Sequence, residues 1–231
     1  MKKLVVLTGA GISAESGIKT FRDMGGLWEE YDVMEVASPQ AWNRDPELVL
    51  RFYNDRRRQL GKVNPNAGHK ALAQIEKYFD VQIITQNVDN LHERAGSGKI
   101  LHLHGELTKV QSTRYSELIY DIGYNDIYIG DYCGKGAQLR PHIVWFGEAV
   151  TAIPHAAAIV EQADILAVVG TSLNVYPAAG LIDYASLQVP VFLVDPNDVP
   201  VYSRHDVTFI KEPASTGVPK MIELIRERFG D

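Results

Sequence analysis

Residues 5–23, VVLTGAGISAESGIKTFRD, decide the fold. A short β-branched run ends at Thr8, a Gly-Ala-Gly turn follows at 9–11, and residues 13–15 favour the start of a helix. A strand that passes through a glycine turn into a helix N-terminus can hold phosphate. Glycine lets the backbone come close to the ligand, and the helix end offers unpaired N–H groups with a positive dipole. The stretch therefore predicts a phosphate-binding turn at the end of a first strand.

The spacing of this turn is that of a dinucleotide site. Gly9, Gly11 and Ala14 satisfy G-x-G-x-x-A in the strand-turn-helix context that the motif requires. The acidic residue expected about 20 residues later on a second strand is not evident. Glu29 and Glu30 lie there, but the surrounding WEEYD does not read as a buried strand. Many α/β proteins use glycine merely to turn tightly, so this alternative stays open on the turn alone.

The rest of the chain alternates between apolar runs and helical patterns. The runs predict strands at Lys3–Thr8, Val81–Thr85, Ile100–Leu103, Ile165–Val169, Val189–Val194 and Val207–Ile210. Helical patterns cover Asn66–Tyr78, with Asn64-Pro65 as cap and first turn, and Pro154–Gln162, Pro177–Ala185 and Pro219–Phe229. Continuous apolar strands between helices predict an α/β, Rossmann-like, doubly wound parallel sheet, with ligands beyond the carboxyl ends of its strands.

Two insertions interrupt this alternation and predict a small second lobe. The first reads as helices, with Asp45-Pro46 opening PELVLRFYNDRRRQL, and the second is rich in Gly, Tyr, Asp and Ser. We expect a single catalytic domain over residues 1–231. Its expected parts are a core of about 1–31, 63–107 and 140–231 and a lobe of about 32–62 and 108–139.

Composition excludes several classes of protein. The net charge of −6 argues against nucleic acid as the main partner, because phosphate binding needs a basic surface. No apolar run reaches membrane-spanning length, and the first strand begins by Leu4, which leaves no room for a signal peptide. A single cysteine, Cys133, excludes an internal disulfide and fits a reducing cytoplasm. We expect a cytoplasmic protein that binds neither nucleic acid nor membrane.

Two polar segments follow strands at the edge where ligands bind. In the first, TQNVDNLH at 85–92, Asn87 and Asp89 could hold a ligand or could simply cap a helix. The second, LHLHGE, carries His102 and His104 on one face of a strand, so spacing cannot choose between them. A histidine leaving a strand end before a glycine can reach a cleft, where its pKa near neutrality suits a general base.

These motifs together resemble those of sirtuins, the NAD-dependent protein-lysine deacylases. GAGISAESGIKTFRD resembles the opening signature of the family, with Lys19 where proline is usual, and TQN-x-D-x-LH is a second family signature. The His-Gly element of the family selects His104 as the base and gives His102 a structural role. The resemblance implies that His104 and Asn87 are catalytic. It implies NAD contacts from Gly9, Ala10, Gly11, Glu15, Phe21, Arg22, Gln86, Asn87, Asp89, Gly170, Thr171, Ser172, Asp195 and Ala214.

Two further segments, VWFGE at 144–148 and GTSLNVYP at 170–177, resemble those between which sirtuins bind the substrate peptide as an added strand. Without the resemblance they would read as a turn and a short strand. The implied peptide contacts are Val144, Phe146, Gly147, Glu148, Leu173, Asn174 and Val175. Acyl-lysine proteins or peptides are the expected partners of a chain that we expect to be monomeric.

Acyl selectivity is predicted by a Tyr-x-x-Arg pair. Tyr53 and Arg56 lie three apart on an expected helix, so they project from one face. A core tyrosine beside a solvated run of arginines at 56–58 is the alternative. The pair resembles that of sirtuins which remove acidic acyl groups, and Ala37 resembles the small residue that widens their acyl pocket. A guanidinium can bind a carboxylate through two parallel hydrogen bonds, so we expect succinyl- and malonyl-lysine to be preferred over acetyl-lysine.

The chain departs from the family at its structural zinc, which sirtuins usually hold by two C-x-x-C pairs. Ser112 and Tyr115 occupy the positions of the first pair, and Cys133 alone remains near the second. Zinc needs about four N or S ligands, so we expect no metal. Packing would then hold the lobe, with the tyrosines at 115, 120, 124, 128 and 132 as candidates.

The resemblance implies a reaction that consumes NAD as a cosubstrate. The acyl oxygen attacks the anomeric carbon of the nicotinamide ribose, and nicotinamide leaves. His104 deprotonates a ribose hydroxyl that attacks the acyl carbon. Water then completes the reaction, and the products are free lysine and an O-acyl-ADP-ribose. Three alternatives stay open at this point: a dehydrogenase that would form NADH, an ADP-ribosyltransferase that would label protein, and a non-catalytic module that binds NAD or peptide.

Overall fold

The first strand is buried on both faces of a sheet. In β1 (Lys3–Thr8), Leu4 and Val6 belong to one hydrophobic cluster, whereas Val5 and Leu7 belong to another. Successive side chains of a strand point to opposite faces, so the apolar run packs helices on each side. The computed structural model describes residues 1–18, 31–173, 176–199 and 206–230.

The large lobe is built on a six-stranded parallel sheet, which confirms the predicted fold class. Its order is β3-β2-β1-β7-β8-β9, so the direction in which strands are added reverses between β1 and β7. The remaining five strands are β2 (Asp80–Thr85), β3 (Ile100–His102), β7 (Ile165–Val169), β8 (Val191–Val194) and β9 (Val207–Ile210). Ligands of doubly wound sheets bind at such a reversal.

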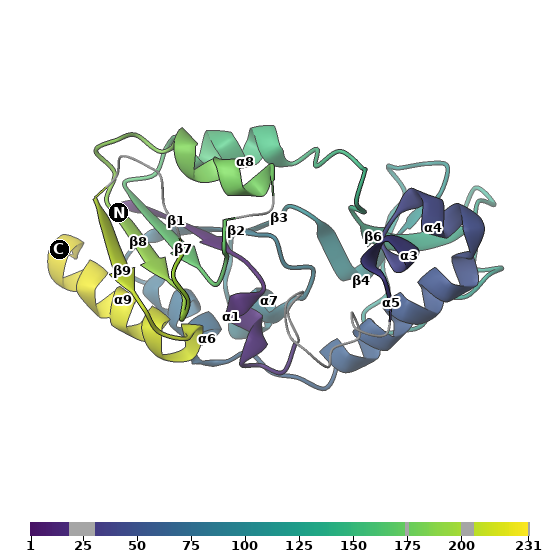
Figure 1. Cartoon of the computed structure of the whole chain (residues 1–231), viewed down its shortest axis with the longest axis horizontal. Helices are drawn as coiled ribbons and strands as arrows, with labels where there is room; N and C mark the ends of the chain where they lie inside the picture. The colour runs from purple at the N-terminus through teal and green to yellow at the C-terminus, as the bar shows by residue number, and fades with distance from the viewer. Residues whose placement is uncertain (19–30, 174–175, 200–205, 231) are drawn as a thin grey trace.

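Helices cover both faces of this sheet (Figure 1). One cluster packs α6 (Ala67–Ile75) and α9 (Ala214–Phe229) below it in the view, and the other packs α8 (Ile153–Val160) and the 3₁₀ helix η1 (Ala178–Tyr184) above it. Two short helices lie at strand ends, α1 (Gly11–Ala14) after β1 and α7 (Leu91–Ala95) after β2.

The small lobe lies at the other end of the molecule (Figure 1). An antiparallel sheet of order β5-β4-β6 joins β4 (Gly105–Ser112), β5 (Ile119–Asp121) and β6 (Leu139–Ile143). Three helices accompany it: α3 (Val33–Val36), α4 (Pro39–Arg44) and α5 (Pro46–Leu60). The sheet extends beyond the expected lobe limits of 108 and 139 at both ends; the division of the chain into core and lobe stays a prediction.

The helix starts agree only in part with the predicted caps. Asp45 caps α5 by accepting a hydrogen bond from the Leu48 amide, as its position before Pro46 predicts. The cap predicted at Asn64 was wrong, because Asn66 accepts from the first amides of α6 instead. The last helix begins at Ala214, and Pro219 lies inside it.

The interior of the small lobe differs from the expectation. The tyrosines at 120, 124, 128 and 132 are exposed, whereas Leu50, Val110 and Ile127 form one buried cluster and a larger one contains Val49 and Phe52. The arginine run is not uniformly solvated either, because Arg57 is fully buried. Its Nε donates to the Leu107 carbonyl at 2.8 Å, and its Nη1 donates to Asn54. Asn54 in turn bonds the backbone of Ile127, so α5 is tied to the segment that carries β4 and β5.

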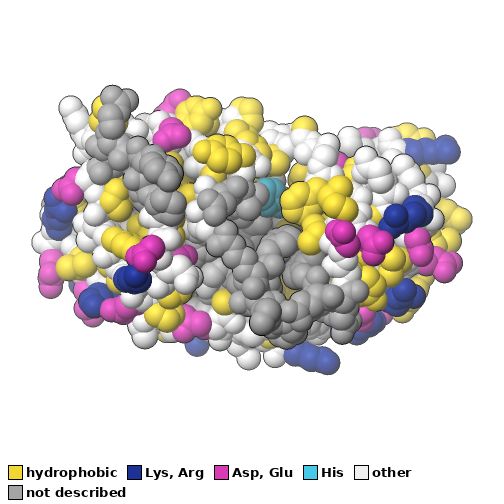
Figure 2. Space-filling view, in the orientation of Figure 1, with side chains coloured by type: hydrophobic (Ala, Val, Ile, Leu, Met, Phe, Trp, Pro, Cys, Tyr) yellow, Lys and Arg dark blue, Asp and Glu magenta, His cyan; other side chains and the backbone are white. Residues whose placement is uncertain are grey.

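The surface carries charges of both signs. Figure 2 shows acidic and basic side chains interspersed over the face in view, without a broad basic area. In the described part of the chain, no helix combines the length and the apolar character needed to span a bilayer.

Candidate active site

The glycine turn lies against a second glycine turn at the reversal point of the sheet. The Gly9 amide donates to the Val169 carbonyl at 3.0 Å, and the Gly11 amide donates to the Gly170 carbonyl at 2.8 Å. A Cβ on Gly9 would lie 2.7 Å from Cβ of Thr171, and one on Gly11 would lie 2.7 Å from Cα of Gly170. Larger residues would therefore push apart the turns after β1 and β7, which form the floor of the crevice.

Gln86 connects this floor to the predicted base. Its amide donates to the Thr8 carbonyl at 2.9 Å, and its Nε2 donates to Oγ1 of Thr171 at 3.2 Å. Its carbonyl is the acceptor for His104, whose Nδ1 lies 3.0 Å away. The structure thus brings together, through one residue, the two turns and His104.

Asn87 and Asp89 meet beside the first turn. The Asn87 side-chain Nδ2 donates to the Gly9 carbonyl at 3.0 Å and to Oγ of Ser13 at 3.1 Å, and this hydroxyl donates to Asp89 at 2.9 Å. Burial raises the pKa of the Asp89 carboxyl. Its other oxygen accepts from the Leu91 amide, so Asp89 also caps α7, as the simpler interpretation predicts. Sequence reasoning missed Ser13, although it lies inside the deciding stretch.

His104 has the protonation that a general base requires. Because Nδ1 faces a carbonyl, it carries the ring proton, and Nε2 keeps its lone pair. Burial lowers the pKa of the imidazole below its ordinary value, although the bond to Gln86 opposes this. The ring is therefore neutral at pH 7. Within the described chain, Nε2 has no hydrogen-bond partner, so it can accept a proton from a substrate.

His102, two residues earlier, is bonded at both nitrogens. Nδ1 lies 2.9 Å from the Asn87 carbonyl, and Nε2 lies 2.8 Å from the Glu93 carboxylate. Together with Glu106, His102 and Glu93 place metal-ligating atoms within 4.8 Å of one another. Glu106 is paired with Lys109 at 2.6 Å, so protein groups already occupy these donors.

Two buried histidines, His69 and His92, lie beside the residues of the first turn; His92 ends the 85–92 signature, whereas sequence reasoning did not single out His69. Nε2 of His69 lies 3.4 Å from Oγ of Ser13, and Nε2 of His92 lies 3.1 Å from Oγ1 of Thr8. Burial lowers the pKa of His69 to about 4 and the pKa of His92 well below its ordinary value. Both rings are therefore neutral at pH 7 and support the turn as packing groups.

Some of the predicted NAD residues have structural partners of their own. The Glu15 carboxylate accepts from the amide and hydroxyl of Ser215 at the start of α9, at 2.8 and 2.6 Å. Asp195 is buried at the end of β8 and accepts from the Asn197 amide. Ala214 is the first residue of α9. Ala10, Thr171 and Ser172 lie in the two turns. Four predicted contacts lie outside the described residues: Phe21, Arg22, Asn174 and Val175.

The predicted acyl-pocket residues contact the 144–148 segment. Trp145 Nε1 donates to the hydroxyl of Tyr53 at 3.1 Å, and the Phe146 amide donates to the Ala37 carbonyl at 3.0 Å. Burial raises the pKa of Tyr53 to about 12, so its hydroxyl stays protonated and can donate. Arg56 lies on the same face of α5; burial lowers its pKa, and interactions with Tyr53 and Asp89 oppose this. The residues predicted to contact the acyl group therefore lie near the 144–148 segment, and Arg56 lies near Asp89 of the 85–92 segment.

Other predicted peptide contacts are shaped by a buried ion pair. Arg140 binds both oxygens of Glu148, at 2.8 and 2.9 Å, and its guanidinium lies 3.6 Å from the Trp145 ring centroid. Glu148 also accepts from the Trp145 amide, so its carboxylate fixes the turn. Gly147 has φ of +92°, and Leu173 follows the second turn with φ of +53°. Val144 donates its amide to the His104 carbonyl, which links the segment to the base.

Comparison with known proteins decides the family. Residues 9–177 match the model of the Sir2 family. The chain belongs to the Sir2 family. An NAD-dependent protein deacylase of Bacteroides thetaiotaomicron is 54% identical over 97% of this chain and 98% of its own length, and one of Helicobacter pylori is 53% identical over 97% and 99%. Among solved structures, a Sir2 homologue complexed with NAD has a TM-score of 0.88 at 38% identity and covers 98% of this chain and 90% of its own. The resemblance to sirtuins is confirmed.

The residues at the usual zinc position of the Sir2 family bond to one another here. The Cys133 thiol donates to Oγ of Ser112 at 3.4 Å, and this oxygen accepts from the amides of Arg114 and Tyr115. Lys135 lies 4.5 Å from the Tyr115 ring centroid. One thiol and one hydroxyl do not form the set of about four N or S ligands that zinc needs.

We therefore predict that the purified protein holds less than about 0.1 zinc per chain, because a structural site needs three or four protein ligands. Metal analysis by mass spectrometry measures this. The unfolding temperature should be the same with and without a chelator. In Cys133→Ser, the zinc content and this insensitivity to chelator should stay unchanged. One tightly bound zinc per chain would contradict the prediction.

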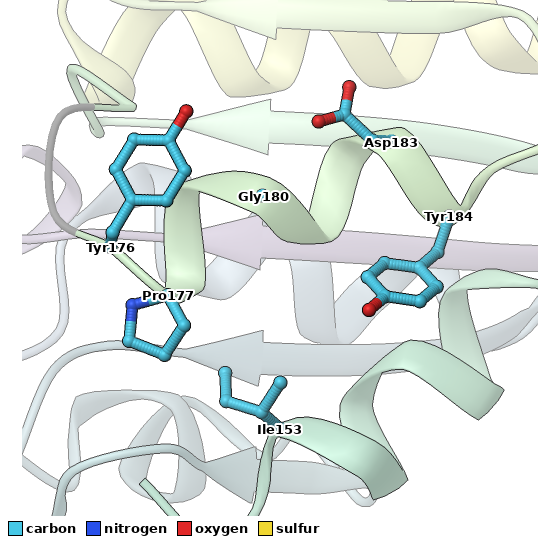
Figure 3. Close-up of a pocket in the computed structure, with 6 residues that line it drawn as sticks. All are labelled: Ile153, Tyr176, Pro177, Gly180, Asp183 and Tyr184. Carbon is cyan, nitrogen blue, oxygen red and sulfur yellow. The ribbon is translucent and has the colours of Figure 1, made fainter. Parts of the chain in front are cut away.

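A surface pocket of about 340 Å³ lies between α8 and η1 (Figure 3). It is lined by Ile153, Tyr176, Pro177, Gly180, Asp183 and Tyr184. None of the individually predicted site residues is among these six, although Tyr176 and Pro177 belong to the 170–177 segment.

Proposed function

We propose that this Sir2 family member is an NAD-dependent protein-lysine deacylase that prefers succinyl and malonyl groups and removes acetyl groups more weakly. The observation that carries the activity is the Gln86 junction, which joins the two turns at the sheet reversal to a neutral histidine. The curated relatives named NAD-dependent protein deacylase, at 53–54% identity, support the same activity.

The protein groups at the ends of β1, β2 and β7 suit the binding of NAD. The glycines at 9, 11 and 170 bring main chain to the strand ends, and Asn87 uses Nδ2 for protein contacts while Oδ1 makes none of these bonds. Solved Sir2 homologues contain NAD or ADP-ribose. When bound, NAD would supply an ADP-ribosyl group that accepts the acyl group as nicotinamide leaves; one water is consumed, and O-acyl-ADP-ribose and free lysine are the products.

The protein contributes position and one proton transfer. The two glycine turns would let the main chain approach the dinucleotide closely, and Gln86 and Asn87 would lie toward the ribose that carries nicotinamide. Nε2 of His104 would accept a proton from a ribose hydroxyl. This nitrogen is unprotonated because Nδ1 carries the ring proton and donates it to the Gln86 carbonyl. Complexes of Sir2 proteins with 2′-O-acetyl and 3′-O-acetyl ADP-ribose support this product class.

The acyl-lysine peptide would bind as an added strand between residues 144–148 and 170–175. Main-chain hydrogen bonds then supply affinity, and side-chain sequence is read loosely. A Sir2 structure with a deacetylated p53 peptide supports a peptide substrate. The link from Val144 to the His104 carbonyl would place this strand beside the base.

Acyl preference is assigned to α3 and α5. Ala37 is small and buried, the Tyr53 hydroxyl is protonated, and Arg56 remains charged although burial lowers its pKa. A guanidinium and a hydroxyl on one helix face can bind an acyl carboxylate, whereas an acetyl group offers them no charge.

Arg56→Met should lower kcat/KM for a succinyl-lysine peptide about 100-fold, since it removes a charge-assisted pair of hydrogen bonds. Activity on the matched acetyl peptide should change less than about threefold, because an acetyl group has no carboxylate to lose the pair. Mass spectrometry of peptide and nucleotide products with NAD measures both, and it also detects ADP-ribose attached to protein.

Arg58→Met is the matched control, because Arg58 is exposed on the same helix and pairs with Asp55 and Asp126. It should leave both activities unchanged. Equal loss on succinyl and acetyl peptides in Arg56→Met would remove the case for acidic acyl selectivity.

A further inference from the structure

The imidazole of His102 is held between two groups that can only accept hydrogen bonds. Nδ1 faces the carbonyl of Asn87 at 2.9 Å, and Nε2 faces the carboxylate of Glu93 at 2.8 Å. A neutral imidazole has one N–H, so both contacts are hydrogen bonds only when the ring is protonated. The His102 side chain is 8% exposed, so little of the ring meets water.

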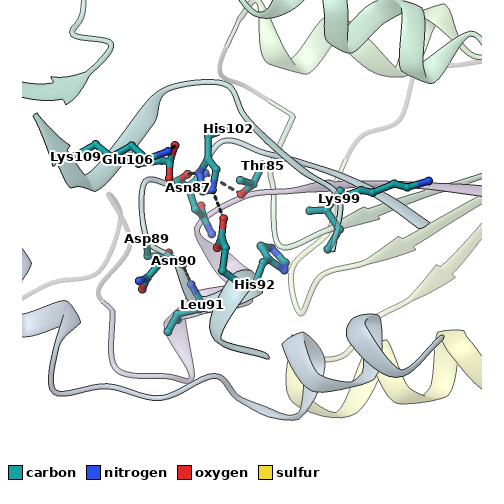
Figure 4. A network of polar contacts seen from close by, with 12 residues as sticks. Thr85, Asn87, Asp89, Asn90, Leu91, His92, Lys99, His102, Glu106 and Lys109 are labelled. Atoms are coloured by element: carbon teal, nitrogen blue, oxygen red, sulfur yellow. Dashed lines mark hydrogen bonds and ion pairs between the residues drawn. The ribbon is translucent and has the colours of Figure 1, made fainter. Parts of the chain in front are cut away.

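The bond from His102 completes the fixing of Asn87. The Asn87 amide donates to Oγ1 of Thr85 at 3.0 Å, and its side chain donates to the Gly9 carbonyl and Ser13. His102 supplies the remaining main-chain donor. Figure 4 shows His102, Asn87 and Thr85 side by side where β2 and β3 end, in agreement with the register that pairs Thr85 with His102.

We propose that His102, held by Glu93, is a positioning residue that orients Asn87 toward the nicotinamide ribose, and that its charged form is the active one. The proposal rests on the NAD-binding role of Asn87 given above. The two histidines of LHLHG then have separate roles, because His104 moves a proton and His102 keeps one.

Charges around His102 favour this state. Burial alone would lower the pKa of His102, but the bond and charge of Glu93, the Asn87 carbonyl and the charge of Glu106 outweigh it and raise the pKa. The other titratable groups that interact with the ring or with these carboxylates are Asp89, His92, Lys109 and His142. Loss of the proton would leave one N–H for two acceptors. The carboxylate would keep it, since charge-assisted bonds are the stronger, and Asn87 would lose its donor.

The pKa of His104 is lowered and that of His102 is raised, so activity plotted against pH should be bell-shaped. Activity should rise through the His104 pKa, below 6.5, because the base must be neutral. It should fall through the His102 pKa, above 6.5, because the positioning bond requires the proton. Between the two limbs both histidines are in their working states.

The decisive experiment measures kcat/KM for NAD against pH in the full chain, with His102 followed by imidazole NMR. Glu93→Gln should move the falling limb to lower pH by about one unit, together with the NMR pKa. His102→Gln should remove that limb and lower kcat/KM for NAD about tenfold at pH 7, with KM for the peptide unchanged. His155→Gln, an exposed histidine on α8, should leave the profile as it is.

A falling limb that stays in place in Glu93→Gln while the NMR pKa drops would overturn the proposal. So would an unchanged KM and kcat for NAD in folded His102→Gln. If the wild-type chain does not turn over acyl peptide, the proposed function fails separately. Calorimetry of NAD binding to the same variants then decides the positioning role: weaker binding supports it, and unchanged binding overturns it.

Discussion

His104→Ala should lower kcat for deacylation about 1000-fold, the contribution typical of a positioned general base. The Nδ1 contact with the Gln86 carbonyl is the one hydrogen bond of the imidazole among the described residues, so the unfolding temperature should change little. NAD binding, measured by calorimetry, should stay within about threefold, because no floor contact is lost. Nicotinamide release and deacylated peptide are measured separately.

The His155→Ala variant controls for the loss of a histidine, because His155 is exposed on α8 and is not among the predicted site residues. It should keep full activity. If His104→Ala retains more than about a tenth of the wild-type kcat, another group is the base, and the assignment built on the Gln86 junction is wrong.

Gly170→Ala should destabilise the fold by about 3 kcal/mol or more and abolish NAD binding. Gly170 has φ of +62°, and a Cβ there would lie 2.3 Å from the amide nitrogen of Ile12. Relief of that contact must separate the two turns and break the bond from the Gly11 amide to the Gly170 carbonyl. Urea unfolding and NAD calorimetry measure the two effects.

Gly123→Ala is a close control, since Gly123 has φ of +56° and nothing within 4 Å of the added Cβ. It should cost only the left-handed backbone term, about 1 kcal/mol. Equal destabilisation of the two variants would show that backbone conformation, rather than contact between the turns, explains the Gly170 requirement.

The parallel sheet could be predicted because its signal is local. β1, β7 and β9 have the bounds that their apolar runs predict. The start of α9 could not be predicted in this way. Glu15, 200 residues before Ser215, accepts a hydrogen bond from the Ser215 amide at the start of α9. The predicted helix starts at Pro219, but this residue lies inside the helix, which begins at Ala214. The small antiparallel sheet was missed because its strands are partly polar, and β5 has only three residues.

The site shows the same division between local and distant information. Two histidines two apart on a strand are equivalent in sequence, and their partners alone distinguish them: a carbonyl for His104, and a carbonyl with a carboxylate for His102. The run of three arginines at 56–58 likewise does not indicate which of them is buried. Burial of Arg57 depends on Asn54 and on segments at least 50 residues ahead in the chain.

The Gln86 junction anchors His104 to the large lobe, whereas Tyr53 and Arg56 belong to α5 of the small lobe and Ala37 follows α3. Under the proposed function, substitutions at these small-lobe positions would change the acyl preference and leave the Gln86 junction as it is. In this arrangement, the acyl group that is removed could change during evolution while the deacylation reaction stays the same.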